Sequence, residues 1–80
     1  MRKPDARIAT LNNHMMGFVD QHFNEEARNN NLSVSVMRTD LPNMFNVRVR
    51  ANSREILSTI DAEVERKAKE IDPTIRLNFC

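Results

Sequence analysis

Three short segments of the chain alternate apolar and polar residues, and this pattern constrains the fold more than any other feature. The segments are residues 32–37 (LSVSVM), 45–51 (FNVRVRA) and 75–79 (IRLNF). A period of two is typical of β-strands that bury one face. Residues 38–43, which join the first two segments, are too many for a two-residue turn and include Pro42. We therefore predict a hairpin with a longer loop.

Two longer segments have apolar residues in steps of three and four, which indicates helices. In the first, from Asp5 to about Arg28, these positions are Ile8, Leu11, Met15, Phe18, Val19, Phe23 and Ala27. In the second they are Ile56, Leu57, Ile60, Val64, Ala68 and Ile71. We predict one long helix over the first segment and a second helix that ends before Pro73.

The ends of these helices have residues of the expected kinds. Pro4 is acceptable in a first helical turn, and the asparagines at 29–31 suit a helix C-terminus. Asn52, with Glu55 three residues later, resembles the capping box that begins a helix. The second helix is therefore expected to start at Asn52.

The other face of the second helix is charged. Its carboxylates Asp61, Glu63, Glu65 and Glu70 follow a surface pattern and do not converge on one point. Two of them precede a lysine by four residues, which predicts the ion pairs Glu63–Lys67 and Glu65–Lys69. We expect a solvated helix surface here and no catalytic site.

The order of elements is α-β-β-α-β, and both helices need a surface to cover. We predict an α+β fold of residues 1–80 as a single domain, a two-layer sandwich with two helices packed on one face of a small three-stranded sheet. The residues expected to face the helices are Leu32, Val34, Val36, Phe45, Val47, Val49, Ile75, Leu77 and Phe79.

The same period of two sends the remaining strand residues to the opposite face of the sheet. They are Ser33, Ser35, Met37, Asn46, Arg48, Arg50, Arg76 and Asn78. Arginine presents a planar fork of donors that fits carboxylates and phosphates. Arg48, Arg50, Arg76 and Met37 are therefore candidate partner-binding residues. The alternative is an ordinary solvated sheet face.

The first predicted helix is longer than the strands it covers. Its 24 or so residues extend about 36 Å, against about 17 to 24 Å for the strands, so one end should overhang the sheet. Apolar residues crowd its middle at Met15, Met16, Phe18 and Val19. This surplus indicates a homodimer or a partner groove on the helix, and the alternative is that the methionines fill the core.

Chain length and composition argue against several classes of protein. The core of an eighty-residue chain leaves no room for an enclosed ligand pocket. We therefore expect no enzyme activity in this chain alone. A net charge of +1 is far from that of a general nucleic-acid coat protein. The single cysteine, Cys80, allows no intramolecular disulfide, and its simplest interpretation is a terminal strand residue. With no apolar run near the roughly 18 residues that span a bilayer, and no signal peptide, we expect a cytoplasmic protein.

Candidate metal ligands are few. His14 and His22 are eight residues apart, about 12 Å along a helix, which is too far to share an ion. His22 and Glu26 are spaced to provide two ligands, but no third ligand is placed by the sequence. We predict no metal site and no cofactor, and no catalytic sequence motif occurs.

These observations favour a small cytosolic, non-enzymatic regulatory protein of bacterial or bacteriophage type. It is expected to act by stoichiometric protein–protein binding and to self-associate. The alternative is a nucleic-acid-binding regulator that uses the arginine-bearing sheet face. A third hypothesis is a subunit of an enzyme whose site is completed by another chain.

Overall fold

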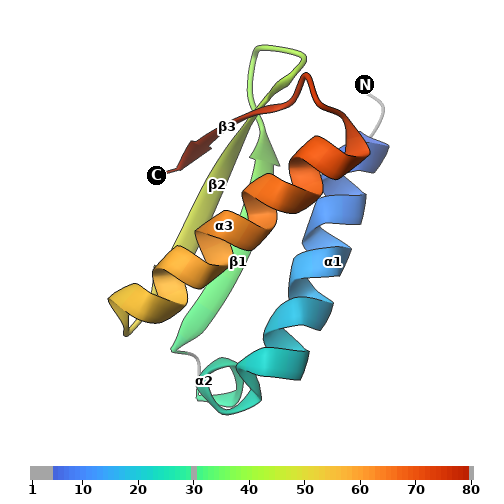
Figure 1. Ribbon diagram of the computed structural model, residues 1–80. Coiled ribbons are helices and arrows are strands. Elements are labelled where there is room, and N and C mark those ends of the chain that lie inside the picture. Colours follow the sequence, from blue (N-terminus) through green and yellow to red (C-terminus); the bar gives the residue numbers. More distant parts are fainter. Residues whose placement is uncertain (1–4, 30, 80) are drawn as a thin grey trace.

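The computed structural model describes residues 5–29 and 31–79, so the predictions for Pro4, Asn30 and Cys80 fall outside the described residues. The elements are α1 (Ala6–His22), α2 (Asn24–Arg28), β1 (Leu32–Arg38), β2 (Met44–Ala51), α3 (Arg54–Ile71) and β3 (Arg76–Phe79). Figure 1 shows α1 and α3 on the same side of the sheet, which confirms the predicted α+β sandwich. No helix in this part of the chain is long and apolar enough to cross a membrane.

The sheet has the strand order β1-β2-β3, with β2 in the centre. β1 and β2 form the predicted hairpin, antiparallel from Leu32↔Ala51 to Arg38↔Phe45. β3 runs parallel to β2 and pairs only with Met44–Val47. A parallel neighbour needs a crossover connection, and α3 provides it. α1 packs on β1 and α3, while α3 packs on β2.

The core lies between the sheet and the two long helices. Its buried residues are Leu11, Met15, Val19, Leu32, Val36, Phe45, Val47, Ile60, Val64, Ala68 and Ile75. Val34, Val49 and Leu77 were predicted to face inward and are partly buried against this core. Phe79 pairs with the buried Val47, so it lies on the predicted face, but it stays 39% exposed. This residue is the last of β3, an outer strand of the sheet.

The prediction of a single long first helix was wrong, because the helix breaks at Phe23. Phe23 has φ −135° and ψ 40°, outside the helical region, and its N–H closes the last turn of α1 on the Val19 carbonyl (2.7 Å). The 17 residues of α1 extend about 26 Å, close to the length of about 23 Å that seven residues give β1. The bend removes the predicted overhang and keeps Phe23 and Ala27 against the core.

The start of α3 lies one residue later than predicted. Ser53, and not Asn52, is the N-cap, and its hydroxyl accepts a hydrogen bond from the Glu55 N–H (3.2 Å). Asparagine and serine are similarly favoured as N-cap residues, so the sequence alone did not decide between Asn52 and Ser53. The helix ends at Ile71, ahead of Pro73, as predicted.

The predicted ion pairs on α3 are replaced by others. Glu63 binds Arg66 three residues later and His14 of α1, instead of Lys67. Lys69 donates to the main-chain carbonyl of Ile75 (2.7 Å), instead of to Glu65. Spacing along a helix shows which side chains can meet, but Arg66 at i+3 and His14 of α1 take Glu63, and a main-chain carbonyl beyond the helix takes Lys69.

Candidate binding surface

One face of the sheet is left uncovered by the helices, and the predicted arginines lie on it. Alternation along the three strands places there Ser33, Ser35, Met37, Met44, Asn46, Arg48, Arg50, Arg76 and Asn78. We call this set the open face. Met44 and Asn46 are half-buried, and the others are exposed. Met44 is the member that the sequence pattern did not include, because β2 starts one residue earlier than expected.

The three arginines share the open face but do not form one cluster. Arg48 and Arg50 are two positions apart on β2, about 7 Å along the strand. Arg76 pairs with Met44, four positions before Arg48 and about 13 Å away along the strand. The structure therefore places a cationic pair at one end of the open face and a single arginine at the other.

Amide and thioether side chains occupy the region between the arginines. The side chain of Asn78 donates a hydrogen bond to that of Asn46 (3.0 Å), which joins β3 to β2 at the surface. Met37 lies opposite Asn46 in the ladder and diagonal to Met44. At 39% exposure Met37 adds apolar area beside this amide pair. The middle of the open face is thus uncharged and partly apolar.

The open face has no carboxylate. In the described strands the only charged residues are arginines, and the acidic residues lie in helices, caps and loops. Within residues 5–29 and 31–79, the side chains of Arg48, Arg50 and Arg76 make no hydrogen bond or ion pair. Their positive charge is therefore uncompensated within the described chain.

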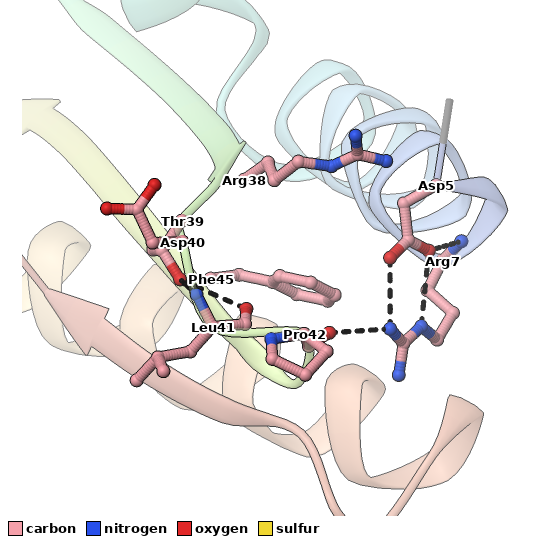
Figure 2. A pocket seen from close by; sticks show the side chains of 8 residues that line it. All are labelled: Asp5, Arg7, Arg38, Thr39, Asp40, Leu41, Pro42 and Phe45. Carbon is pink, nitrogen blue, oxygen red and sulfur yellow. Dashed lines mark hydrogen bonds and ion pairs between the residues drawn. The ribbon is translucent and has the colours of Figure 1, made fainter. Parts of the chain in front are cut away.

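Arg7, near the start of α1, is the opposite case. Figure 2 shows its guanidinium turned toward Asp5 and the hairpin loop. It donates to both carboxylate oxygens of Asp5, to the Asp72 carboxylate (2.8 Å), to the Asn43 side chain and to the Pro42 carbonyl. Its guanidinium carbon also lies 5.1 Å from the centre of the Phe45 ring.

These contacts make Arg7 a structural residue. It ties the start of α1 to the loop between β1 and β2 and to the end of α3. The neighbouring pocket of about 320 Å³ is lined by Asp5, Arg7, Phe45 and residues 38–42. Its Arg7 donors are already engaged within the fold. Sequence reasoning missed Arg7 because most of its partners lie 35 to 65 positions away.

The acids around Arg7 respond to it. Hydrogen bonds from the Arg7 side chain hold the pKa of Asp5 below its ordinary value. The pKa of Asp72 is lowered first by hydrogen bonds from Thr74 and then by Arg7. Both carboxylates are therefore kept in the charged form that Arg7 binds.

A second charged network joins α1 to α3. Arg66 donates to both oxygens of Glu63 (2.8 and 2.9 Å), and the His14 ring nitrogen Nε2 lies 2.6 Å from the same carboxylate. Arg66 also binds Glu70. Hydrogen bonds from Arg66 and then from His14 lower the pKa of Glu63 to about 2, against the opposing effect of burial. The carboxylates of α3 therefore do converge in part, on Arg66.

The predicted binding residues of the first helix are divided between core and surface. Met15 and Val19 are buried. Phe18 is partly buried, with its ring 4.6 Å from that of His22 and 6.5 Å from that of His14, centre to centre. Met16 is 70% exposed and is the member of the set that presents a large apolar side chain to solvent.

The candidate metal pair lies on either side of the break in the first helix. His22 ends α1 and Glu26 lies in α2, so the break at Phe23 removes the helical spacing that would align them. Across the described residues, no group of three His, Cys, Asp or Glu side chains is placed to hold a metal ion.

Comparisons with known proteins add no relative. No protein-family model, no curated protein and no solved structure matches this chain. The inference about function therefore depends on the geometry and charge of the surfaces described above.

Proposed function

We propose that this chain is a non-enzymatic regulatory protein of the cytoplasm that acts by stoichiometric binding to another protein through its open face. The supporting observation concerns Arg48, Arg50 and Arg76, which are exposed on a face that has no carboxylate. Their side chains bind no acceptor in the described chain. Charge complementarity then selects a partner with an acidic surface.

The composition of the open face favours a protein partner. Arginine and methionine are enriched at the centres of protein–protein interfaces, where lysine, aspartate and glutamate are depleted. The open face has three arginines and two methionines and no lysine, aspartate or glutamate, but its two serines belong to a type that is also depleted there. Methionine side chains also adapt to irregular partner surfaces.

Nucleic acid is the second candidate, because the same uncompensated charge also suits phosphates. Single-stranded nucleic acids are bound largely by stacking of bases on aromatic side chains. The open face has no aromatic residue. A phosphate-binding function would therefore depend on the arginines alone, and it becomes an outcome of the experiment below.

We also propose that the protein self-associates, as the crowded first helix predicts. Met16, Leu41 and Met37 are the apolar side chains of the described chain, besides Phe79, that remain well exposed. Light scattering at micromolar concentration tests this part of the proposal, and a strictly monomeric protein at high concentration would contradict it.

The experiment is affinity purification from a lysate of the source cells, with and without nuclease. Arg48→Glu combined with Arg50→Glu should abolish binding of the partner, because it reverses the cationic pair while Val47 and Val49 still face the core. The matched control is Arg28→Glu combined with Arg54→Glu. It makes the same change in net charge on exposed positions of α2 and α3 and should bind as the unmodified protein does.

Three results separate the candidates. The proposal is supported if a partner protein co-purifies even after nuclease treatment and is lost only with the open-face variant. A signal that disappears with nuclease, and an affinity that falls steeply with salt, would favour nucleic acid. Equal losses in both double variants would show that net charge matters and that the open face does not.

A further inference from the structure

The outer edge of β1 is closed at one point by a side chain of α1. The amide of Asn12 donates to the Val36 carbonyl (3.1 Å) and accepts from the Val36 N–H (2.9 Å). Both main-chain groups of Val36 therefore point away from β2. In an antiparallel ladder this identifies Val36↔Val47 as a non-hydrogen-bonded pair.

The same alternation fixes the groups that precede Val36. Pairs two positions apart are of the same type, so the N–H and C=O groups of Val34 and Leu32 also point to the outer edge. No hydrogen bond outside the ladder reaches these four groups from residues 5–29 and 31–79. The run of free main-chain groups on β1 is short. Before it, the Asn31 N–H donates to the Glu26 carbonyl (2.9 Å), and after it, Asn12 binds the main chain of Val36.

A groove of about 740 Å³ lies along this stretch, within the range of volumes that bind ligands. One wall is β1, from Leu32 to Ser35. The other is formed by α1 and α2 and includes Met16, Gly17 and Ala27. Gly17 leaves open space where a side chain would project, with no atom within 4 Å of an added Cβ. We call this feature the edge groove.

The edge groove differs in charge from the open face. Residues 32–37 of β1 are uncharged, although edge strands are commonly protected from pairing by lysine or proline. The one charged side chain of the lining is Asp20, which is exposed and has no ion-pair partner in the described chain. An occupant of this groove should therefore be apolar with a positive charge, unlike the acidic partner of the open face.

We propose that the edge groove binds an extended peptide segment of a partner protein, which adds to β1 as a fourth strand. Its main chain pairs with the free groups of Leu32 and Val34. Alternate side chains of the segment are apolar and face Met16 and Ala27, and a lysine or arginine reaches Asp20. Main-chain pairing supplies affinity in this mode, and the alternate side chains supply specificity.

The walls of the groove select a peptide segment over a second copy of the chain. α1 and α2 stand beside the free edge of β1, as Figure 1 shows, so a strand entering there comes between them and β1. A second copy would bring its own α1, which lies beside its own β1 in the same way. A single extended segment has no such layer.

The test uses phage-displayed random peptides of about ten residues, the upper length of an ordinary strand, with the purified protein as bait. We expect selected peptides to alternate apolar residues and to include a lysine or arginine. Gly17→Trp should fill the groove and weaken a selected peptide at least about tenfold, while Gly17→Ala changes little. Val34→Pro removes a free N–H that the fold does not use and should weaken binding about tenfold, in contrast to Val34→Ala.

Control measurements keep this test separate from that of the open face. The Arg48→Glu and Arg50→Glu double variant should bind the selected peptide as the unmodified protein does. The proposal is overturned if no peptide is enriched above the Gly17→Trp bait, or if selected peptides bind Val34→Pro and Val34→Ala equally. It is also overturned if the protein forms a dimer that Gly17→Trp dissolves, because the occupant is then a second copy.

Discussion

Three cations of the helix layer bind acceptors within the fold, whereas the arginines of the open face bind none in the described chain and resemble the exposed Arg28 and Arg54 of α2 and α3 in this respect. Arg7, Arg66 and Lys69 each bind acceptors from other turns or other elements. Arg48 and Arg50, on the sheet, have no acceptor in the described chain. The paired cations join α1, α3 and the hairpin loop, so their donors are used within the fold. The unpaired cations contribute nothing comparable to the fold and remain available to a partner.

This difference has a simple origin in the topology. Carboxylates need solvent or a cation, and the described chain places them in helices, caps and loops, where Arg7 and Arg66 reach them. The strands bring no acid to the open face, and the helices cover only the other face of the sheet. Four predictions test how far the two regions differ, beginning with the packing that both depend on.

The largest effect is expected at Val64, which is fully buried in the middle of α3. Val64→Asp places an unpaired charge in the core, which costs several kcal/mol against a total stability of about 5 kcal/mol for a small domain. We expect loss of the folded state, measured by circular dichroism during urea titration. The control is Glu65→Gln, one residue away and exposed, which should melt as the unmodified protein does. Equal stability of the two variants would contradict the assignment of Val64 to the core side of α3 and of Glu65 to the solvent side.

The second effect tests the paired cation directly. Arg7→Ala removes hydrogen bonds to Asp5, Asp72 and Asn43 and should destabilise the fold by about 2 kcal/mol, since bonds to charged groups contribute more than neutral ones. Arg50→Ala, on the open face, should change the free energy of unfolding by less than about 0.5 kcal/mol. Similar losses for the two variants would remove the distinction between paired and unpaired arginines.

The sequence predicted the open face well because a strand has a fixed period. Once 45–51 is a strand with Val47 and Val49 inward, Arg48 and Arg50 must face outward. The charge of the open face followed from the same reasoning. Its layout did not, since the distance from Arg76 to Arg48 depends on the register of β3 against β2, and nothing in either segment fixes that register.

The features that the sequence could not give all depend on contacts between distant residues. Arg7 finds Asp72, and Asn12 finds the edge of β1, across separations of 65 and 24 positions. The break at Phe23 leaves no trace in the sequence pattern, because a regular apolar period continues through it to Ala27. Periodicity describes each element alone, and it does not show contacts that reach outside the helix, such as His14 with Glu63 and Lys69 with the Ile75 carbonyl.

The third prediction concerns pH and the Glu63 network. The folded pKa of Glu63 is lowered from its ordinary 4.5 to about 2, so its contribution is full above about pH 4.5 and is lost as the pH falls toward 2. Because Arg66, the main cause, is 56% exposed and screened by solvent, we expect a loss of about 1 kcal/mol. Urea titrations of the unmodified protein and of Glu63→Gln check this. The unmodified protein should lose more stability over this range, and parallel losses would contradict the role of the network.

The smallest effect is expected on the open face, and its sign is informative. Arg48 and Arg50 lie on the same side of β2, about 7 Å apart, and repel each other without a neighbouring acid. Arg50→Glu turns this repulsion into attraction, so it should stabilise the fold slightly, by no more than about 0.5 kcal/mol, and only at low salt. Thermal melting at low and high salt measures it. The matched reversal Arg66→Glu, within the helix layer, should destabilise, because it sets a third carboxylate beside Glu63 and Glu70. If Arg50→Glu instead destabilised the fold at low salt and this loss shrank at high salt, Arg50 would have an acidic partner, and the positive charge of the open face would no longer be free to bind another molecule.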